Sequence, residues 1–307
     1  MAYQRRVSGN DGERDCEERS EMIRGELVTP GIVMDIGSAE GYFCRQIASC
    51  RNLLVVSVES DSGRVNVQRR WAAPLMGRVV ICQKAFDVAI AGKLSSQCDF
   101  FENVLLLSVL HWMPQPDMIV KHLSLVSGKL FVELPDPADR RACGQDKIGL
   151  IGEDQQGWLE KHTGRSVRLI GKPKAHTSKT RNLWVIEGPF SRSPPCAFVN
   201  APIRPDTYRL TWDGQKVSFE KSGKNSVWIP GVNLETLRLM GVIFPCRRWW
   251  FEKVGLELDK VIASGINHRD RRIWNVIAVN GGVRWIDPNL AFFFNTIEKD
   301  LKDFSVQ

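Results

Sequence analysis

The stretch that decides the fold is Val33-Met-Asp-Ile-Gly-Ser-Ala-Glu-Gly-Tyr-Phe43. It belongs to an apolar run that ends at Asp35, which is typical of a buried β-strand. Gly37 and Gly41 follow with three residues between them, and because neither has a Cβ atom, the backbone can turn sharply there and approach a ligand closely. Residues 41–50 suit a helix. A strand that leads through a glycine loop into a helix predicts a binding site at the carboxyl end of that strand.

Further apolar runs along the chain predict the rest of a sheet. Continuous apolar strands separated by helical lengths indicate a parallel sheet that is covered on both faces. The last two predicted strands are joined by only twelve residues, which leaves no room for a crossover helix, so we expect an antiparallel pair at one sheet edge. The fold class predicted is therefore α/β, with a seven-stranded Rossmann-like sheet, mostly parallel with an antiparallel edge strand. The expected strands are Gly31–Asp35, Leu53–Val58, Arg78–Cys82, Asn103–Leu107, Lys129–Glu133, Val167–Ile170 and Leu183–Glu187.

An acidic residue ends the second predicted strand. Glu59 stands there, about twenty residues after the glycine loop, and Asp61 comes just after it. A carboxylate at this position is placed to accept hydrogen bonds from both ribose hydroxyls of a nucleoside. A dinucleotide site is disfavoured, because it needs the pattern G-x-G-x-x-G, and here three residues separate the two glycines.

These motifs resemble those of the class I S-adenosylmethionine-dependent methyltransferases. Asp35-Ile-Gly-Ser-Ala-Glu-Gly41 is similar to their first motif, D/E-x-G-x-x-x-G, Val58-Glu59 to their acidic motif, and the resemblance spans roughly residues 30–190. The resemblance implies that S-adenosyl-L-methionine is the cofactor. It further implies that Gly37 and Gly41 line the methionine side of the cofactor, that Asp35 helps to orient the loop, and that Glu59 binds the ribose. The segment Gln83-Lys-Ala-Phe86, which would touch the adenine, lacks the usual acidic side chain. The cofactor-binding residues so implied are Asp35, Gly37, Ser38, Gly41, Tyr42, Glu59, Ser60 and Ser108.

Candidate catalytic residues follow the fourth and fifth predicted strands. Methyl transfer from a sulfonium is an in-line displacement, so the enzyme aligns the acceptor and, for a hydroxyl, removes its proton. His111 is a candidate base; alternatively, it packs beside Trp112 and bonds to a neighbouring loop. Glu133 and Asp136 are candidates for acceptor binding or base catalysis, or else they cap a helix or loop.

The acceptor is constrained by what the motifs lack. No Asn/Asp-Pro-Pro-Tyr/Phe loop follows the fourth strand, which disfavours N-methylation of nucleic-acid bases, and no recognisable pair of catalytic cysteines indicates carbon-5 methylation. We expect an oxygen acceptor on a small molecule, sugar or phosphate. A basic loop before the last strand can meet a phosphate or carboxylate, or can be a solvated hairpin tip; it contains Lys172, Lys174, His176, Lys179 and Arg181.

Four regions are expected along the chain. Residues 1–29 are a polar leader whose charged part can form a surface helix that frays, and residues 30–190 are the methyltransferase domain. A proline-containing linker over 191–206 precedes a small, basic α+β domain over 207–307, which starts with a hairpin around Asp213-Gly214. Within that domain, the segment from Asn267 to Pro288 resembles the catalytic segment of kinase-like phosphotransferases. That resemblance would make Asp270 the base that accepts the substrate proton, and Asn275 and Asp287 metal ligands. No glycine-rich loop accompanies this segment.

Composition sets the remaining expectations. The net charge is +7, and residues 191–307 hold 17 basic and 12 acidic groups, which fits an anionic partner or equally a solvated basic surface. The eight cysteines form no C-x-x-C pair, so we expect no structural zinc and no other metal. With neither a secretory signal nor an apolar run long enough to span a membrane, a cytoplasmic protein is expected. Two alternatives to the small-acceptor enzyme stay open: an RNA methyltransferase that uses the basic region, and a non-catalytic regulatory partner with the same fold.

Overall fold

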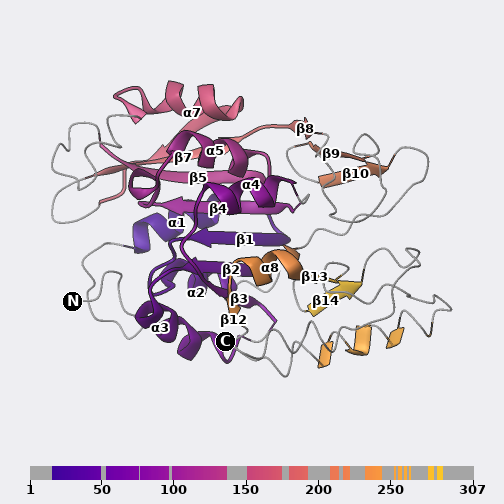
Figure 1. Ribbon diagram of the computed structural model, residues 1–307. Coiled ribbons are helices and arrows are strands. Elements are labelled where there is room, and N and C mark those ends of the chain that lie inside the picture. Colours follow the sequence, from indigo (N-terminus) through magenta and orange to yellow (C-terminus); the bar gives the residue numbers. More distant parts are fainter. Residues whose placement is uncertain are drawn as a thin grey trace.

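A computed structural model gives the architecture of the chain. It describes residues 16–49, 53–75, 77–96, 99–136, 151–174, 180–192, 208–213, 217–221, 232–243, 276–279 and 282–285, and short stretches between 252 and 263. One large sheet dominates, with its strands in the order β12-β3-β2-β1-β4-β5-β7-β6 (Figure 1). The strands of this sheet are β1 (Gly31–Ile36), β2 (Leu53–Glu59), β3 (Val79–Gln83), β4 (Phe101–Leu107), β5 (Ser127–Pro135), β6 (Ser166–Gly171), β7 (Arg181–Glu187) and β12 (Val242–Ile243).

The strand directions confirm the predicted fold class. Strands β3, β2, β1, β4 and β5 run parallel to one another, and β7 lies antiparallel to both β5 and β6. The predicted seven strands, with their antiparallel edge pair, are thus present. The eighth strand, β12, adds to that prediction. It belongs to the C-terminal part of the chain and pairs antiparallel with β3 at the opposite edge.

Helices cover both faces of the sheet because its strands are apolar on both sides. Every residue of β2 and β4 is buried, as expected for central strands of a doubly covered sheet. Val33 and Val55 pack toward α1, α2 and α3, while Met34 and Val56 pack toward α4, α5, α7 and α8. The bounds of these helices are α1 (Glu17–Glu26), α2 (Tyr42–Ala48), α3 (Ser62–Ala72), α4 (Val88–Ser96), α5 (Pro116–Ser124), α7 (Gln155–Thr163) and α8 (Leu234–Leu239).

Local sequence sets where several helices begin and end. Helix α3 starts after Asp61, whose carboxylate accepts a hydrogen bond from the Arg64 N–H at 2.8 Å. Asp154 caps α7 in the same way, and α7 ends at Gly164, whose φ of +66° is a common helix stop for glycine. Among the described residues, no helix combines the length and the apolar character needed to cross a membrane.

Helix α1 packs on the sheet instead of lying free on the surface, and the expected fraying stays a prediction. Cys16 and Ile23 are fully buried, and Arg19 is only 2% exposed. The three side chains lie on one side of the helix, so they give it a buried stripe even though charged residues surround them. This packing was not expected from the sequence, because the stripe contains an arginine, and a sequence pattern counts arginine as a surface residue.

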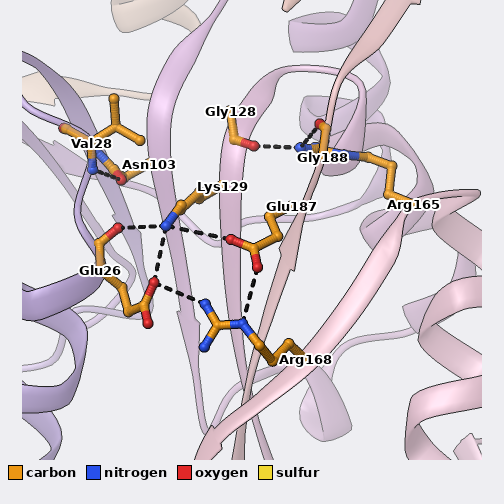
Figure 2. Close-up of polar contacts among 9 residues, drawn as sticks. All are labelled: Glu26, Val28, Asn103, Gly128, Lys129, Arg165, Arg168, Glu187 and Gly188. Atoms are coloured by element: carbon orange, nitrogen blue, oxygen red, sulfur yellow. Dashed lines mark hydrogen bonds and ion pairs between the residues drawn. The ribbon is translucent and has the colours of Figure 1, made fainter. Parts of the chain in front are cut away.

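The C-terminal end of α1 is tied to the sheet by a network of four charges (Figure 2). The Glu26 carboxylate accepts from Lys129 Nζ on β5 and from Arg168 Nη2 on β6, both at 3.0 Å. Glu187, at the end of β7, lies 3.4 Å from Lys129 Nζ and 3.0 Å from Arg168 Nε. The network thus joins α1 to three strands at the edge that the sequence predicted to be antiparallel.

Among the described residues, two small sheets involve the C-terminal part. Strands β8 (Phe190–Arg192), β9 (Tyr208–Trp212) and β10 (Val217–Lys221) form one, in which the β9–β10 pair confirms the hairpin predicted around Asp213-Gly214. The other consists of β11 (Val232–Asn233), β13 (Val276–Val279) and β14 (Gly282–Trp285). Most of the predicted linker over 191–206 lies outside the described residues, so the domain boundary stays a prediction.

Candidate active site

A cleft of about 440 Å³ opens at the carboxyl ends of β1, β2, β3 and β4. Its volume falls within the range of about 300–1,000 Å³ that small-molecule sites occupy. Arg19 of α1 closes one end, near the ends of β4 and β5, and residues 84–86 after β3 form the other. The predicted site residues that line the cleft are Asp35, Gly37, Glu59, Ser60 and Ser108.

The two glycines of the loop after β1 have different surroundings. Gly37 lies in the cleft wall with a φ of +71°, and a Cβ atom added there would collide with the side chain of Val109. Gly41 has a φ of +81°, and an added Cβ atom would lie 2.5 Å from the indole ring of Trp71 on α3. Both positions therefore need glycine, but only Gly37 faces the cleft.

A buried polar network connects the glycine loop to α3. Gln68 of α3 is fully buried and donates hydrogen bonds to Ser38 Oγ at 2.9 Å and to the Ala39 carbonyl at 2.6 Å. The hydroxyl of Ser57, on β2, donates to Gln68 Oε1 at 2.6 Å and lies 2.7 Å from Ser38 Oγ. Ser38 therefore fixes the shape of the loop from behind, and its side chain is not part of the cleft wall.

Tyr42 also lies outside the cleft wall, at the first position of α2. The residue is 9% exposed, and its ring meets the ring of Phe43 edge to face, with 5.5 Å between centroids. Phe43 lines the cleft instead. Tyr42 was among the cofactor-binding residues that the resemblance implies, but the first turn of α2 presents the side chain of Phe43 to the cleft.

The carboxylate of Glu59 is held in place by main-chain groups. Its Oε1 accepts from the N–H groups of Ser60 and Asp61 at 2.8 and 2.9 Å, and its Oε2 accepts from the N–H of Ala39 at 2.7 Å. A carboxylate offers about four acceptor positions. One position on Oε2 thus remains for a ligand such as a ribose hydroxyl. The expected contact of Glu59 with both ribose hydroxyls stays a prediction.

Asp35 lies beneath the glycine loop and is 2% exposed. Burial raises the pKa of its carboxyl to about 7, although the Cys44 thiol, which donates to Oδ2 at 3.1 Å, partly offsets that effect. The carboxyl borders the cleft, so its protonation near neutral pH changes the charge at the floor of the site.

Arg19 forms a buried ion pair that no pattern in the sequence indicated. Its Nη1 donates to Glu133 Oε2 at 2.8 Å, and its guanidinium lies 5.3 Å from the centre of the Phe43 ring. On the other carboxylate oxygen, Glu133 Oε1, Ser108 Oγ donates at 2.5 Å and Arg181 Nε lies at 3.6 Å. Burial alone would raise the pKa of Glu133, but the charge of Arg19 and the Ser108 hydroxyl outweigh it and lower the pKa. Glu133 is therefore an enclosed, ionised carboxylate that anchors α1 beside the cleft.

Neither of the other two candidate catalytic residues lines the cleft. His111 stands in the short 3-10 helix η1 (Leu110–Trp112), is 1% exposed, and has its ring 5.3 Å from that of Trp112. Its neighbours Val109, Trp112 and Met113 line the cleft. Asp136 comes directly after β5, is half-buried and does not line the cleft. Catalytic roles for His111, Glu133 and Asp136 stay predictions.

Two further cations line the cleft and were not among the predicted site residues. They are Arg64, in the first turn of α3, and Lys84, directly after β3. The position of Lys84 had a sequence signal, because the segment after the third strand was expected to reach the cofactor. For Arg64, the only indication in the sequence that it could reach the cleft was its position five residues after Glu59.

Several predicted residues fall outside the described part of the chain. These are His176 and Lys179 of the basic loop and the three residues of the kinase-like segment, Asp270, Asn275 and Asp287. The β13–β14 hairpin between the last two is present. Within the described ranges, no cluster of three or more His, Cys, Asp or Glu residues could hold a metal ion.

Comparisons with known proteins give a likeness in structure only. No protein-family model matches the sequence, and no curated protein does. A SAM-dependent methyltransferase from Aquifex aeolicus aligns with 54% of this chain and 88% of its own, at 13% identity and a TM-score of 0.42. One structure of the kinase-methyltransferase WbdD aligns with 100% of this chain and with 76% of its own length. A second WbdD structure, with a kinase inhibitor bound, aligns with 90% of this chain and with 76% of its own length. Both alignments have 16% sequence identity and a TM-score of 0.50. At that identity, the likeness to WbdD shows the fold alone.

Proposed function

We propose that this chain is an S-adenosylmethionine-dependent methyltransferase whose acceptor is an oxygen on a small molecule, sugar or phosphate. The observation that carries the proposal is the cleft itself, which joins the glycine turn at Gly37, the oriented carboxylate of Glu59 and the segment after β3 in one continuous wall. A nucleoside needs such a wall, with a close backbone approach at one point and a hydroxyl acceptor at another. The single acceptor position left on Glu59 Oε2 suits one ribose hydroxyl.

Each part of the cleft has a role in this proposal. When bound, S-adenosylmethionine supplies an electrophilic methyl group on a sulfonium. Glu59 orients the sugar, and Phe86 provides an apolar surface at the nucleoside end. At the other end, Val109, Trp112 and Met113 would exclude water and align the acceptor, which is the main requirement of an in-line displacement.

The charge of Arg19 supports an anionic acceptor, because Arg19 lines the cleft near the ends of β4 and β5. The other two cations of the wall, Arg64 and Lys84, lie at the nucleoside end beside Glu59, and the carboxylates of Asp35 and Glu59 also line the cleft. Asp35 is neutral for part of the time near pH 7, because burial raises its pKa to about 7. Cations at the wall of a low-dielectric cleft attract phosphate or carboxylate groups more strongly than they would in open solvent.

Calorimetry with S-adenosylhomocysteine tests the proposal. The intact chain should bind it with a dissociation constant on the order of micromolar. Ser60→Phe should abolish binding, because Ser60 is an exposed residue in the cleft wall and the larger ring would fill the cleft without disturbing the core. Ser62→Phe is the matched control, since Ser62 is also exposed, two residues further on, and does not line the cleft. Failure of the unmodified chain to bind would overturn the proposal and leave a non-catalytic partner as the better account.

An RNA methyltransferase is the second candidate, favoured by the net charge of +7 and the cations in the cleft wall. RNA binding driven by phosphate contacts weakens steeply as salt rises. Filter binding of a generic RNA at low and at physiological salt separates the two candidates. Binding that falls with salt supports the RNA acceptor, and no binding even at low salt removes it.

A further inference from the structure

The C-terminal strand β12 meets the main sheet at the residues that lead into the cleft wall. Val242 and Ile243 pair with Cys82 and Ile81 of β3. Just before them, the carbonyl of Gly241 accepts a hydrogen bond from the N–H of Gln83 at 2.9 Å. The pairing thus reaches the last residue of β3, immediately before the segment 84–86 that lines the cleft.

Gly241 makes this contact only because it is glycine. Its φ is +67°, and a Cβ atom there would lie 2.8 Å from the Gln83 carbonyl oxygen and 3.8 Å from Lys84 Cβ. A side chain at this position would have to push the end of β3 away. Gly241 does not itself line the cleft.

Lys84 is held from both sides. Its Nζ donates to the carbonyl of Leu239, the last residue of α8, at 2.9 Å, and its N–H donates to the carbonyl of Glu59 at 3.0 Å. Lys84 thus connects the C-terminal segment directly to the residue that carries the oriented carboxylate.

Helix α8 is anchored in the main core, so these contacts are rigidly supported. Figure 1 shows α8 beside the β2–β3 side of the sheet, with β12 next to β3. Leu234, Leu237 and Met240 are buried in the same apolar cluster as Phe86. In addition, Thr236 Oγ1 donates to Asp99 Oδ2 at 2.6 Å, and both residues are 2% exposed.

We propose that residues 232–243 are a positioning segment for the nucleoside end of the cleft, holding Lys84 and Phe86 where the bound cofactor meets them. This inference rests on the proposed methyltransferase function. It assigns a role in cofactor binding to a part of the chain that lies about 150 residues beyond the cleft residues it positions. Changes in the C-terminal region therefore alter cofactor affinity without any contact with the cofactor.

Gly241→Ala, compared with Gly164→Ala, tests the proposal. Both glycines have a positive φ, +67° and +66°, so both alanines carry the same backbone strain, but the space around Gly164 is open within 4 Å. Gly241→Ala should weaken S-adenosylhomocysteine binding about tenfold, whereas Gly164→Ala should leave it within about twofold although it carries the same backbone strain. Equal affinity in the two variants would overturn the proposal. If the intact chain does not bind the ligand at all, the proposed function itself is overturned, and this inference with it.

Hydrogen exchange in the unmodified protein gives a second readout that needs no variant. Adding S-adenosylhomocysteine should slow exchange at the amides of Gln83 and Lys84, which are bonded to the Gly241 and Glu59 carbonyls, and also along β12. Protection confined to the loops after β1 and β2, with β12 and the end of β3 unchanged, would contradict the proposal.

Discussion

Arg19 and Glu133 join the N-terminal helix to the end of β5 through charges that are almost fully removed from solvent. A buried ion pair contributes little net stability compared with apolar residues, but the loss of one partner leaves the other charge without compensation. The position of Arg19 in the cleft wall means that this pair also determines the shape of the site.

Arg19→Ala should therefore destabilise the protein by about 3 kcal/mol, because Glu133 would keep only the more distant Arg181 as a cation. Urea unfolding followed by circular dichroism measures the change. Arg24→Ala is the control on the same helix, because Arg24 is exposed and its loss should cost under about 0.5 kcal/mol. Equal effects of the two substitutions would show that the ion pair does not hold α1 in place.

Glu102 gives a pH-dependent prediction away from the cleft. Its Oε2 accepts from the Ile32 N–H at 2.6 Å, and burial raises its pKa to about 7. Because the pKa is higher in the folded than in the unfolded state, the neutral carboxyl contributes to the free energy of unfolding. This contribution is fully present below about pH 4.5 and is lost as the pH rises through about 7.

Glu102→Gln keeps a backbone acceptor but cannot ionise. The free energy of unfolding of the variant minus that of the unmodified protein should therefore increase by about 1–3 kcal/mol from pH 5 to pH 8. Asp35 titrates in the same range but is present in both proteins, so its effect cancels in the difference. A difference that stays constant over this pH range would refute the assignment.

Single residues of the site were predictable where the backbone alone positions them. Gly37 and Ser60 directly follow strand ends, and Glu59 ends β2, so their place in the wall follows from the topology of a parallel sheet. A cofactor contact of Gly41 stays a prediction, because a glycine motif does not reveal whether a ligand or another side chain, here that of Trp71, occupies the space beside it.

At the scale of elements, the strands of the main sheet were the most predictable, because each is a continuous apolar run. The predicted Leu53–Val58 and Lys129–Glu133 correspond to the observed Leu53–Glu59 and Ser127–Pro135. Helix α1 was expected, but its packing was not. Its buried stripe includes Arg19, which finds its partner 114 residues away in sequence.

Glycine substitutions test whether α1 and the loop before α2 are both held as described. Gly25→Ala should stabilise the protein by about 0.5–1 kcal/mol, because Gly25 lies within α1 and has open space around it. Gly41→Ala should destabilise it by about 2 kcal/mol or more, through its positive φ and the contact with Trp71. Thermal unfolding of both variants checks the signs, and a stabilising Gly41→Ala would contradict the loop geometry.

At the scale of the whole molecule, the N- and C-terminal parts of the chain both reach the central sheet. Helix α1 packs on one face of the sheet, α8 packs on the other face, and β12 adds a strand at the β3 edge. The sequence could not predict β12, because two apolar residues carry no periodicity and their partner strand lies about 160 residues earlier.

A chain that ends at residue 206 should consequently lose more than the C-terminal part. Leu234, Leu237, Met240 and Val242 are buried in the main core, and each contributes about 1.5–3 kcal/mol when fully buried. Their joint loss approaches the whole stability of a typical domain, about 5–15 kcal/mol. Urea unfolding should show a shortened chain that is largely unfolded or has a much lower midpoint. An unchanged midpoint would show that α8 and β12 add nothing to the sheet.

The central claim is that the cleft between Gly37, Glu59 and Phe86 holds a sulfonium nucleoside. A crystal structure of the intact chain with S-adenosylhomocysteine tests it most directly. We predict the nucleoside in this cleft, one ribose hydroxyl within hydrogen-bond distance of Glu59 Oε2, and the base beside Phe86. Ligand density at another place on the molecule, or a ribose that makes no contact with Glu59, would contradict the account.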